Sequence, residues 1–388
     1  MPDIAIIGGG LAGGLAALAI TRAAPQLSVS LIEAGDSFGG NHRWSWFEGD
    51  LGPQEAALLE PFEKTEWTGG NDVRFPAHER RLEGNYRSLD SRDFDAALRR
   101  LLPQEAIRTG SRVMGLDGNG VTLESGERIA AKALIDCRDA VPSEHLEGGW
   151  QVFLGQHLRT SEPHGIDRPV IMDAAVEQPD AYRFVYLLPL GTDEIFVEDT
   201  YYTDRPVVDA ATLRDRIADY CAQRGWQTEA LHEETGILPV ITGGDFAAYR
   251  ASLANPGVAV AGARGGFVHP LTSYTLPIAA QNALAIAGAA AEDLAGLPEF
   301  VEDRAHAHWK RTAYYRLLGK MLFEAAEPAE RYRVFERFYR LPEPLISRFY
   351  AARSTPLDKL RILTGRPPVP VGRAIKALLG KGAPLVQG

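Results

Sequence analysis

The first third of the chain alternates between short apolar runs and longer stretches of helical length. Residues 3–7 and 27–33 have the length and β-branched content of buried strands, whereas residues 11–23 form an Ala- and Leu-rich stretch long enough for a helix. This order predicts a βαβ unit. A second helix is expected at residues 89–98, capped by Asp90 or Ser91, and further strands at residues 121–123 and 133–136. Residues 35–67 show no regular period and are expected to be irregular.

The middle of the chain has a different pattern, in which short strand-like runs follow one another closely. We expect these strands at residues 150–155, 169–174, 182–188, 194–202 and 236–240. They predict an antiparallel sheet, interrupted by one helix at residues 212–224. A buried strand at residues 258–262, a Gly-rich loop and a helix at residues 276–294 then repeat the strand–loop–helix pattern of the first segment. From residue 299 the pattern is mainly helical until the prolines at 367–370.

A glycine motif lies between the first strand and the first helix. Gly8, Gly10 and Gly13 fit the pattern GxGxxG, and Glu33 follows 20 residues after Gly13 at the end of the second strand. Such glycines permit a tight turn, close approach of a pyrophosphate to the backbone, and packing of helix on strand, while the acidic residue accepts from a ribose hydroxyl. The motif in this context predicts a dinucleotide site, although NAD and FAD both use it.

Two downstream features favour FAD over NAD. Gly40, Asn41 and His42 follow Glu33 in the manner of flavoproteins of the hydroxylase and reductase type. The late strand, Gly-rich loop and helix supply Gly262, Arg264, Gly265 and Gly266, where such proteins hold the isoalloxazine ring. We therefore expect FAD as the cofactor.

These elements together predict an α/β protein with a Rossmann-like FAD-binding domain, an inserted antiparallel-sheet substrate domain and a helical C-terminal region. The expected FAD-binding parts are residues 1–75, 89–149 and 246–298. The expected substrate-domain parts are residues 76–88 and 150–245. Residues 299–388 form the helical, basic region that we expect to face a membrane.

Charge is distributed unevenly along the 388 residues. The net charge is −10, but residues 309–388 carry 16 Lys and Arg against 6 Asp and Glu, whereas the remainder carries a balance of −20. A basic end on an acidic body predicts docking on an anionic surface, or alternatively a solvated helical face, and argues against nucleic acid. No run of about 18 apolar residues is uninterrupted, and no signal peptide is recognisable. We expect a cytoplasmic protein, peripheral at the inner face of the cell membrane.

Cysteine usage adds little chemistry. The two cysteines, Cys137 and Cys221, are far apart and have no metal-binding spacing, so neither a disulfide framework nor a metal site is expected.

Several segments resemble one family, the bacterial lycopene β-cyclases of carotenoid synthesis. The resemblance runs from residue 3 to about residue 375. It is carried by Gly39-Gly-Asn-His-Arg-Trp-Ser-Trp46, Val73-Arg-Phe-Pro76, Val170-Ile-Met-Asp-Ala174, Tyr182-Arg-Phe-Val-Tyr186, Val197-Glu-Asp-Thr200, His269-Pro270 and the segments at 332–339 and 361–370. Three segments depart from the family's pattern: Ser273 stands for a glycine in the first, Cys137 and Asp139 replace glycines around Asp136 and Arg138 in the second, and His157 stands for a glutamate in the third. The resemblance adds Asp136 and Arg138 to the expected FAD contacts.

The resemblance implies an enzyme of the isomerase or intramolecular lyase class. Such a cyclase protonates the terminal double bond of a linear carotene, lets a neighbouring double bond attack the cation, and removes a proton to leave a β-ring, by way of γ-carotene to β-carotene. The implied flavin is reduced, with NAD(P)H or a cellular reductase as the electron donor, and stabilises the carbocation. The implied partners are lycopene and related linear carotenes, the membrane surface and carotenoid-pathway enzymes.

Protonating an alkene requires an acid that stays neutral near pH 7, which burial of a carboxyl provides. Glu198 and Asp199 lie in an apolar strand and, with period 2, face opposite ways. Periodicity favours Asp199, whose face is more apolar, whereas the family resemblance favours Glu198. A structural ion pair or a strand-end cap is the alternative for either residue.

Other residues are candidates for the remaining roles. His269 is a candidate proton acceptor or flavin partner, with a buried core histidine as the alternative. Trp44, Trp46 and Tyr201 are candidates for stabilising the cation. Two other functions remain open: a flavin-dependent oxidoreductase like geranylgeranyl reductase, and a carotenoid-binding flavoprotein without catalysis.

Overall fold

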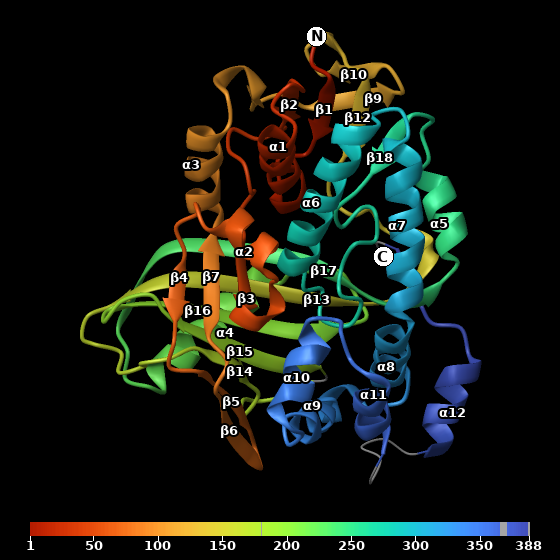
Figure 1. Ribbon diagram of the computed structural model, residues 1–388. Helices are drawn as coiled ribbons and strands as arrows, with labels where there is room; N and C mark the ends of the chain where they lie inside the picture. The colour runs from red at the N-terminus through yellow and green to blue at the C-terminus, as the bar shows by residue number, and fades with distance from the viewer. Residues whose placement is uncertain (180, 365–370, 387–388) are drawn as a thin grey trace.

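The computed structural model describes residues 1–179, 181–364 and 371–386. At one end of the molecule lies a five-stranded sheet in the order β18-β12-β1-β2-β8, with every neighbouring pair parallel (Figure 1). These strands are Val258–Val260, Ala133–Asp136, Ile4–Ile7, Val29–Ile32 and Ile107–Arg108. The parallel sheet, joined through helices, is the predicted Rossmann-like unit.

Both faces of the parallel sheet are covered. Ile4 and Ile6 point to the helices α1 (Leu11–Ala23) and α6 (Leu276–Glu292), which lie side by side (Figure 1). Ala5 and Ile7 point the other way, to a three-stranded antiparallel sheet. That sheet consists of β9 (Val113–Asp117), β10 (Gly120–Leu123) and β11 (Arg128–Ala130). The strand expected at residues 121–123 therefore belongs to this covering sheet rather than to the parallel one.

A long, mostly antiparallel sheet crosses the middle of the molecule, in the order β17-β13-β16-β15-β14-β5-β6 (Figure 1). Its strands are Thr228–Gly244, Ser143–Thr160, Glu194–Thr203, Tyr182–Pro189, Val170–Asp173, Asn71–Phe75 and His78–Leu82, and Pro384–Leu385 (β19) pairs with β13. Only β14 and β5 are parallel. The sheet confirms the antiparallel prediction, although β13 and β17 extend well beyond the short runs expected. The domain boundaries remain a prediction.

The segment expected to be irregular is folded. It contains β3 (Arg43–Phe47), the 3₁₀ turn η1 (Glu48–Asp50), α2 (Pro53–Leu59) and β4 (Thr65–Trp67), and both strands pair with β7 (Tyr86–Asp90). The expectation was wrong because this region is held by tertiary packing, in which Trp46 lies in the core with Leu58 and Leu59.

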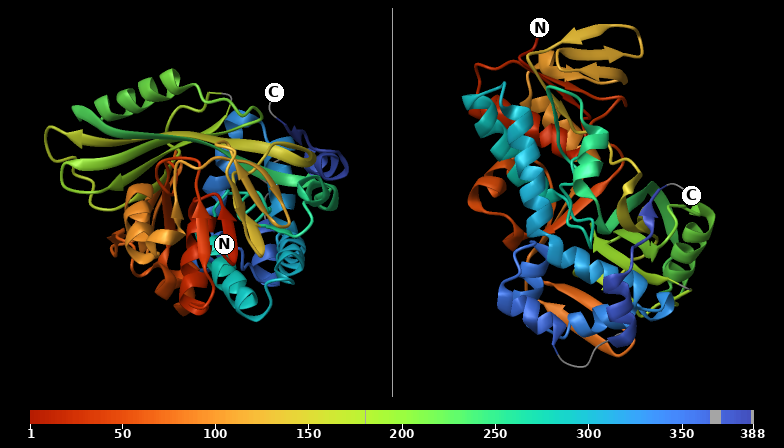
Figure 2. Two further views of the ribbon diagram at one scale, coloured as in Figure 1. Left: turned by 90° about the horizontal axis from the view of Figure 1, so that it is seen from above. Right: turned by 90° about the vertical axis from the view of Figure 1, so that its right-hand side faces the viewer.

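Helices cover the two faces of the long sheet. On one face, α4 (Ala210–Ala222) packs on Ile195 and Val197. On the other face, Phe184 and Phe196 pack with the C-terminal helices, which lie at the opposite end of the molecule from the parallel sheet (Figure 2, right). The remaining helices are α3 (Ser91–Leu101), α5 (Phe246–Leu253), α7 (Leu297–Arg311), α8 (Ala313–Glu324), α9 (Tyr332–Phe338), α10 (Glu343–Tyr350), α11 (Pro356–Leu363) and α12 (Val371–Leu379), with short 3₁₀ turns at Gln104–Ala106 and Pro328–Glu330.

A local signal explains where α3 begins. Asp90 caps α3, where its side chain accepts a hydrogen bond from the backbone N–H of Arg92 at 2.9 Å, as one of the two expected caps. The prolines expected to stop the C-terminal helices at 367–370 lie outside the described residues, and α12 follows them, so the helical region continues further than expected. None of the helices in the described part of the chain is long and apolar enough to cross a bilayer.

Candidate active site

The glycine motif opens a cavity of about 720 Å³ at the carboxyl ends of β1 and β2, which we call the nucleotide cavity. Gly8 has φ +95°, and a Cβ there would lie 2.8 Å from the carbonyl oxygen of Cys137. A Cβ on Gly13 would lie 2.0 Å from the carbonyl oxygen of Gly8, so this glycine allows α1 to pack on the loop. A Cβ on Gly10 would meet no atom within 4 Å, because it would project into open space.

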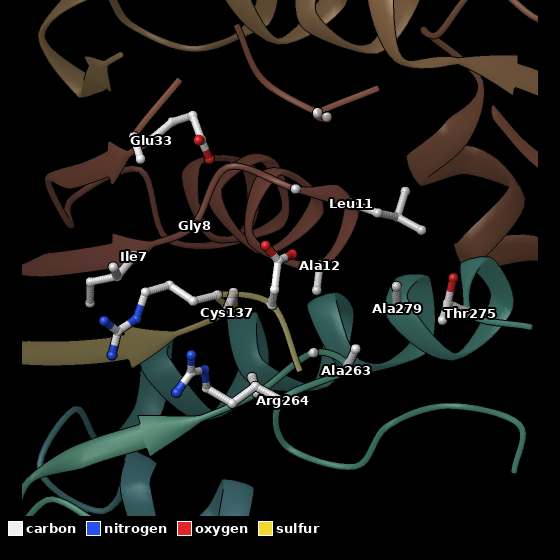
Figure 3. A pocket seen from close by; sticks show the side chains of 18 of the residues that line it. Ile7, Gly8, Leu11, Ala12, Glu33, Cys137, Ala263, Arg264, Thr275 and Ala279 are labelled. Atoms are coloured by element: carbon white, nitrogen blue, oxygen red, sulfur yellow. The ribbon is translucent and has the colours of Figure 1, made fainter. Parts of the chain in front are cut away.

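Glu33 closes one end of the nucleotide cavity. Its carboxylate accepts hydrogen bonds from the backbone N–H groups of Gly9 at 2.7 Å and Gly35 at 2.8 Å. Figure 3 shows Glu33 on one side of the Gly8 loop, with Arg264 and Cys137 on the other. Each carboxylate oxygen keeps capacity for another donor, such as a ribose hydroxyl.

Most of the residues expected to contact FAD line the nucleotide cavity. They are Gly8, Gly10, Glu33, Gly40, His42, Arg138, Gly262 and Arg264. Gly13, Asn41, Asp136, Gly265 and Gly266 are not among its lining residues. Asn41 instead binds His232 and the carbonyl oxygen of Glu233, and Asp136 binds the guanidinium of Arg138 at 2.7 Å. The cavity is also lined by residues 111–114 and by Asn282, for which the sequence carries no recognisable signal.

A second, smaller cavity of about 150 Å³ adjoins the first, and we call it the acid cavity. Trp44, Leu238 and Thr275 line both cavities. Six aromatic residues line the acid cavity, and among its described lining residues the carboxyl is that of Glu198. Its other lining residues include Arg43, Ser45, Tyr86, Gln151, Phe153, Tyr186, Leu188, Phe196, Thr272, Ser273, Tyr274 and Leu276. A carboxyl among aromatic rings beside a nucleotide cavity is suited to acid chemistry on an apolar substrate.

Glu198 lies on β16 beside Tyr186 of β15 and Gly155 of β13, so these three residues share the face of the sheet that carries the acid cavity. The hydroxyl of Thr200 donates a hydrogen bond to Glu198 Oε1 at 2.6 Å. Burial raises the pKa of the Glu198 carboxyl to about 7, because an apolar surrounding disfavours the charged form. A substantial fraction of Glu198 is therefore protonated at neutral pH.

Asp199 points to the opposite face, toward α4. Its side chain is fully buried, and its carboxylate accepts hydrogen bonds from Arg183 Nε at 2.8 and 3.1 Å. This ion pair is the arrangement that the sequence left open as the structural alternative, and it keeps Asp199 away from the acid cavity.

His269 is also fully buried and lines neither cavity. Its Nε2 lies 3.2 Å from the carbonyl oxygen of Phe349, and its Nδ1 accepts from the backbone N–H of Thr272 at 3.3 Å. Burial lowers the pKa of its ring to about 3, so the imidazole is neutral. In this arrangement His269 holds the Thr272 turn against α10.

The aromatic residues considered for stabilising the cation, and Ser273, lie in different places. Trp44 lines the acid cavity, whereas Trp46 is in the core and Tyr201 packs on the α4 side. Ser273 lines the acid cavity rather than the nucleotide cavity, and it adopts a positive φ of 54°, which suits the glycine usual in the family. Ser273 Oγ donates to the carbonyl oxygen of Pro239 at 2.7 Å.

Two buried carboxyls near the acid cavity have no sequence signal. Glu234 of β17 lies beside Gly155, one strand beyond Glu198, and burial raises its pKa to about 8, with the neighbouring Glu198 adding to the shift. Asp50 accepts a hydrogen bond from the hydroxyl of Tyr274 at 2.6 Å. Asp50 and Tyr274 are 224 residues apart in the chain, so only the fold brings them together.

A third cavity, of about 260 Å³, lies among the C-terminal helices, and we call it the helix cavity. Its walls are almost entirely apolar: Leu271, Leu318, Met321, Leu322, Val334, Phe335, Arg337, Phe338, Leu341, Phe349, Tyr350, Ile362, Leu363, Ala374, Ile375 and Leu378. Leu271 of this cavity precedes Thr272 of the acid cavity, and the rings of Tyr350 and Tyr274 are 6.5 Å apart. The helix cavity thus borders the acid cavity.

Known proteins with similar sequences include lycopene β-cyclases. That of Pseudescherichia vulneris is 44% identical over 380 residues, covering 98% of this chain and 97% of that protein. That of Pantoea ananas is 38% identical over 378 residues, covering 97% and 98%.

Solved structures show the same fold at low sequence identity. A geranylgeranyl bacteriochlorophyll reductase-like protein of Thermoplasma acidophilum has a TM-score of 0.60 at 14% identity, covering 98% of this chain and 96% of its own. Klebsiella pneumoniae HpxO, solved with FAD and uric acid, has a TM-score of 0.57 at 16% identity, covering 91% and 97%. These likenesses confirm the predicted fold class.

The sequence family is defined over nearly the whole length of the chain. Residues 3–376 match the family model described as "Lycopene cyclase protein". Together with the full-length relatives, this match confirms the resemblance: the chain belongs to the lycopene cyclase family.

Proposed function

We propose that this protein is a lycopene β-cyclase, an enzyme that closes the linear ends of lycopene into β-rings without net oxidation or reduction. The observation that carries this proposal is the Glu198 carboxyl, which lies in an aromatic cavity and has a pKa raised to about 7. Full-length relatives named lycopene β-cyclase support the same reaction.

In the proposed reaction, Glu198 gives its proton to the terminal double bond of the substrate. The neighbouring double bond attacks the resulting cation and closes the ring, and loss of a proton leaves the β-ring. The rings of Trp44, Tyr86 and Tyr186 face the same cavity as Glu198. Aromatic faces stabilise a cation by about 0.5 to 2 kcal/mol each, and an aromatic wall also excludes water that would capture the cation.

We propose FAD as the cofactor of this reaction. The residues that fit it are Gly8 and Gly10 for the pyrophosphate, where the backbone is open to the cavity, and Glu33 for the ribose. When bound and reduced, FAD supplies negative charge that stabilises the carbocation. Thr275, the N-cap of α6, lies where the two cavities adjoin, so the positive end of that helix favours an anionic group there. We propose NAD(P)H as the source of electrons.

We also propose that the C-terminal helices attach the protein to a membrane, where its apolar substrate dissolves. Leu357 and Leu360 of α11 and Leu379 of α12 are 77%, 60% and 84% exposed, and Ile375 of α12 is 53% exposed. Basic residues lie among them: Lys359, Arg361, Arg373 and Lys376. Exposed apolar side chains with interspersed basic ones suit the surface of an anionic bilayer. We propose that the substrate reaches the acid cavity by way of the helix cavity, whose walls are almost entirely apolar.

The function is tested by incubating the purified, dithionite-reduced protein with lycopene in liposomes and chromatographing the pigments. The proposal predicts γ-carotene and β-carotene without net consumption of NAD(P)H. The reductase-like fold neighbour motivates the alternative of a flavin-dependent oxidoreductase, which would instead consume NAD(P)H in proportion to product. A carotenoid-binding protein without catalysis would return lycopene unchanged.

A further inference from the structure

The acid cavity has a hydroxyl backed by a buried carboxylate, on Tyr274 and Asp50. Tyr274 lines the cavity and donates its hydroxyl proton to Asp50 Oδ2 at 2.6 Å. The Tyr274 oxygen in turn accepts a hydrogen bond from the backbone N–H of Phe47 at 3.2 Å. Asp50 is 0% exposed, and among the described residues its Oδ1 has no hydrogen-bond partner. Leaving a buried carboxylate oxygen unpaired is costly, so such a group calls for an explanation.

The cyclisation needs a proton acceptor as well as an acid, and His269 does not face the cavity. Glu198 and Tyr274 reach the cavity from different elements, β16 and the loop before α6. The cavity therefore has a carboxyl acid and, at another part of its wall, a hydroxyl oxygen in contact with a carboxylate. This arrangement provides separate donor and acceptor groups for one substrate end.

Resting on the proposed function, we propose that Tyr274 takes the proton from the cyclised carbocation and passes its own hydroxyl proton to Asp50. The C–H bond breaks and its electron pair becomes the ring double bond. The proton joins the Tyr274 oxygen as the original hydroxyl proton moves to Asp50 Oδ2. Tyr274 ends unchanged, Asp50 ends neutral and Glu198 ends ionised, so one proton has moved from Glu198 to Asp50. Exchange with solvent then restores both groups. Tyr274 is the catalytic residue, and Asp50 is the positioning residue that acts through it.

Ionisation of Asp50 sets the pH range in which the Tyr274–Asp50 pair can accept a proton. Burial raises the pKa of Asp50 to about 6, while the Tyr274 hydroxyl, the Phe47 backbone N–H and the Arg353 guanidinium oppose that shift. The hydroxyls of Tyr86 and Tyr350 also face Asp50 and stay neutral, because burial raises their pKa values well above 7. Asp50 is therefore mostly ionised above about pH 6, where it can accept a proton, whereas Glu198 is protonated below about pH 7. Activity is expected to be bell-shaped between these limits.

The test uses Asp50→Asn and Tyr274→Phe in the full-length, FAD-loaded protein. Tyr220→Phe is the matched control, because Tyr220 donates to the buried Asp173 at 2.7 Å on the α4 side, away from the acid cavity. Turnover of lycopene in liposomes is expected to fall about 100-fold in both test variants and to stay near wild type in the control. Asp50→Asn is also expected to lose the acidic limb of the pH profile. Thermal denaturation and FAD content report whether each variant folds.

Two further readouts separate a chemical role from a structural one. With lycopene deuterated at the carbon that loses its proton, both variants are expected to show a larger isotope effect than wild type, because deprotonation becomes slower. The ring isomers are expected to change, since loss of a proton from a different carbon gives a different double bond. A folded Asp50→Asn with wild-type turnover, pH profile and isotope effect overturns the proposal. If Asp50→Asn does not fold, a folded Tyr274→Phe with wild-type turnover and isotope effect overturns the proposal instead. A wild-type protein that forms no cyclic product would instead contradict the proposed function.

Discussion

Arg183 Nε donates hydrogen bonds to both carboxylate oxygens of Asp199, at 2.8 and 3.1 Å, on the face of the long sheet that α4 covers. The next residue along the chain, Glu198, faces the other way into the acid cavity. Two adjacent carboxyls thus lie in different surroundings: one is paired with a guanidinium, and the other is desolvated among aromatic rings. Adjacent positions on β16 therefore carry a structural carboxylate on one face of the sheet and the candidate acid on the other.

Asp199→Asn is expected to act mainly on stability. The substitution removes the charge that pairs with Arg183, whose side chain is 8% exposed, and leaves a buried guanidinium without a counter-ion. The free energy of unfolding is expected to fall by about 3 kcal/mol. Denaturant unfolding measures this loss, and turnover per folded molecule is expected to stay within a few-fold of wild type. Unchanged stability would show that the ion pair contributes little.

Glu198→Gln is expected to act on turnover instead. Glutamine keeps the size of the side chain and can accept from Thr200, but it has no proton to donate to an alkene. Ring closure is expected to fall by at least about 100-fold, with FAD binding and folding retained. Pigment profiles of a lycopene-producing host, at matched protein level, measure the effect. β-Carotene with Glu198→Gln but only lycopene with Asp199→Asn would assign the acid to Asp199.

The pH dependence of the wild-type enzyme follows from the same carboxyl. The pKa of Glu198 is raised to about 7, so the reactive protonated form is present below that pH and is lost as the pH rises through it. Turnover is expected to fall about tenfold for each pH unit above 8, measured in liposomes with reduced enzyme. A flat profile from pH 6 to about 9 would exclude Glu198 as the acid with this pKa.

Gly10→Val is expected to abolish uptake of FAD while leaving the fold intact. A Cβ at this position would meet no protein atom within 4 Å, so the side chain would occupy the nucleotide cavity rather than strain the chain. Flavin fluorescence titration measures the affinity. Gly288→Val is the control, because Gly288 is exposed on α6 and its Cβ would also meet no atom. Wild-type flavin affinity in Gly10→Val would contradict the cofactor assignment.

The double substitution Leu360→Gln with Leu379→Gln is expected to weaken attachment to vesicles. Both leucines are largely exposed, so the fold should tolerate the change, whereas the apolar contribution to bilayer binding is lost. Sedimentation with phosphatidylglycerol-containing vesicles at high salt measures this apolar contribution. Salt screens the attraction of the basic residues to the vesicles but does not weaken the contact of the apolar side chains with the bilayer. Val207→Gln changes an exposed valine outside the C-terminal helices and serves as the control. Equal sedimentation of the wild type, the double variant and the control would show that these leucines do not attach the protein to the vesicles.

Local pattern predicted the parallel unit and the antiparallel strands because each has a strong period and clear bounds. It also predicted that Glu198 and Asp199 face opposite ways. It pointed to Asp199 for the acid because Ile195 and Val197 share its face, yet those side chains are apolar because α4 covers them. An apolar face indicates burial and does not distinguish a packed core from a cavity. The family resemblance, which favoured Glu198, agrees with the geometry of the cavity.

Sequence could not predict features that depend on distant partners. Trp46 is fixed by packing against α2, so the segment around it has no clear period of its own. Asp50 and Tyr274 meet only in the folded chain, and neither lies in a motif that names a base. His269 stands in a family motif, but its ring binds the backbone at Phe349 rather than facing a cavity, and no local pattern reveals that direction.

The most direct test of the account is the mass of the product formed in D₂O. Reduced, FAD-loaded protein is incubated with lycopene in liposomes, in D₂O and separately in H₂O. The pigments are then separated, and their masses are measured by mass spectrometry. Protonation by Glu198, whose proton exchanges with solvent, predicts rings that each carry one solvent deuterium, and a product in H₂O with the same mass as lycopene. A product that has gained two hydrogens, or cyclic product without deuterium, would contradict acid-initiated cyclisation.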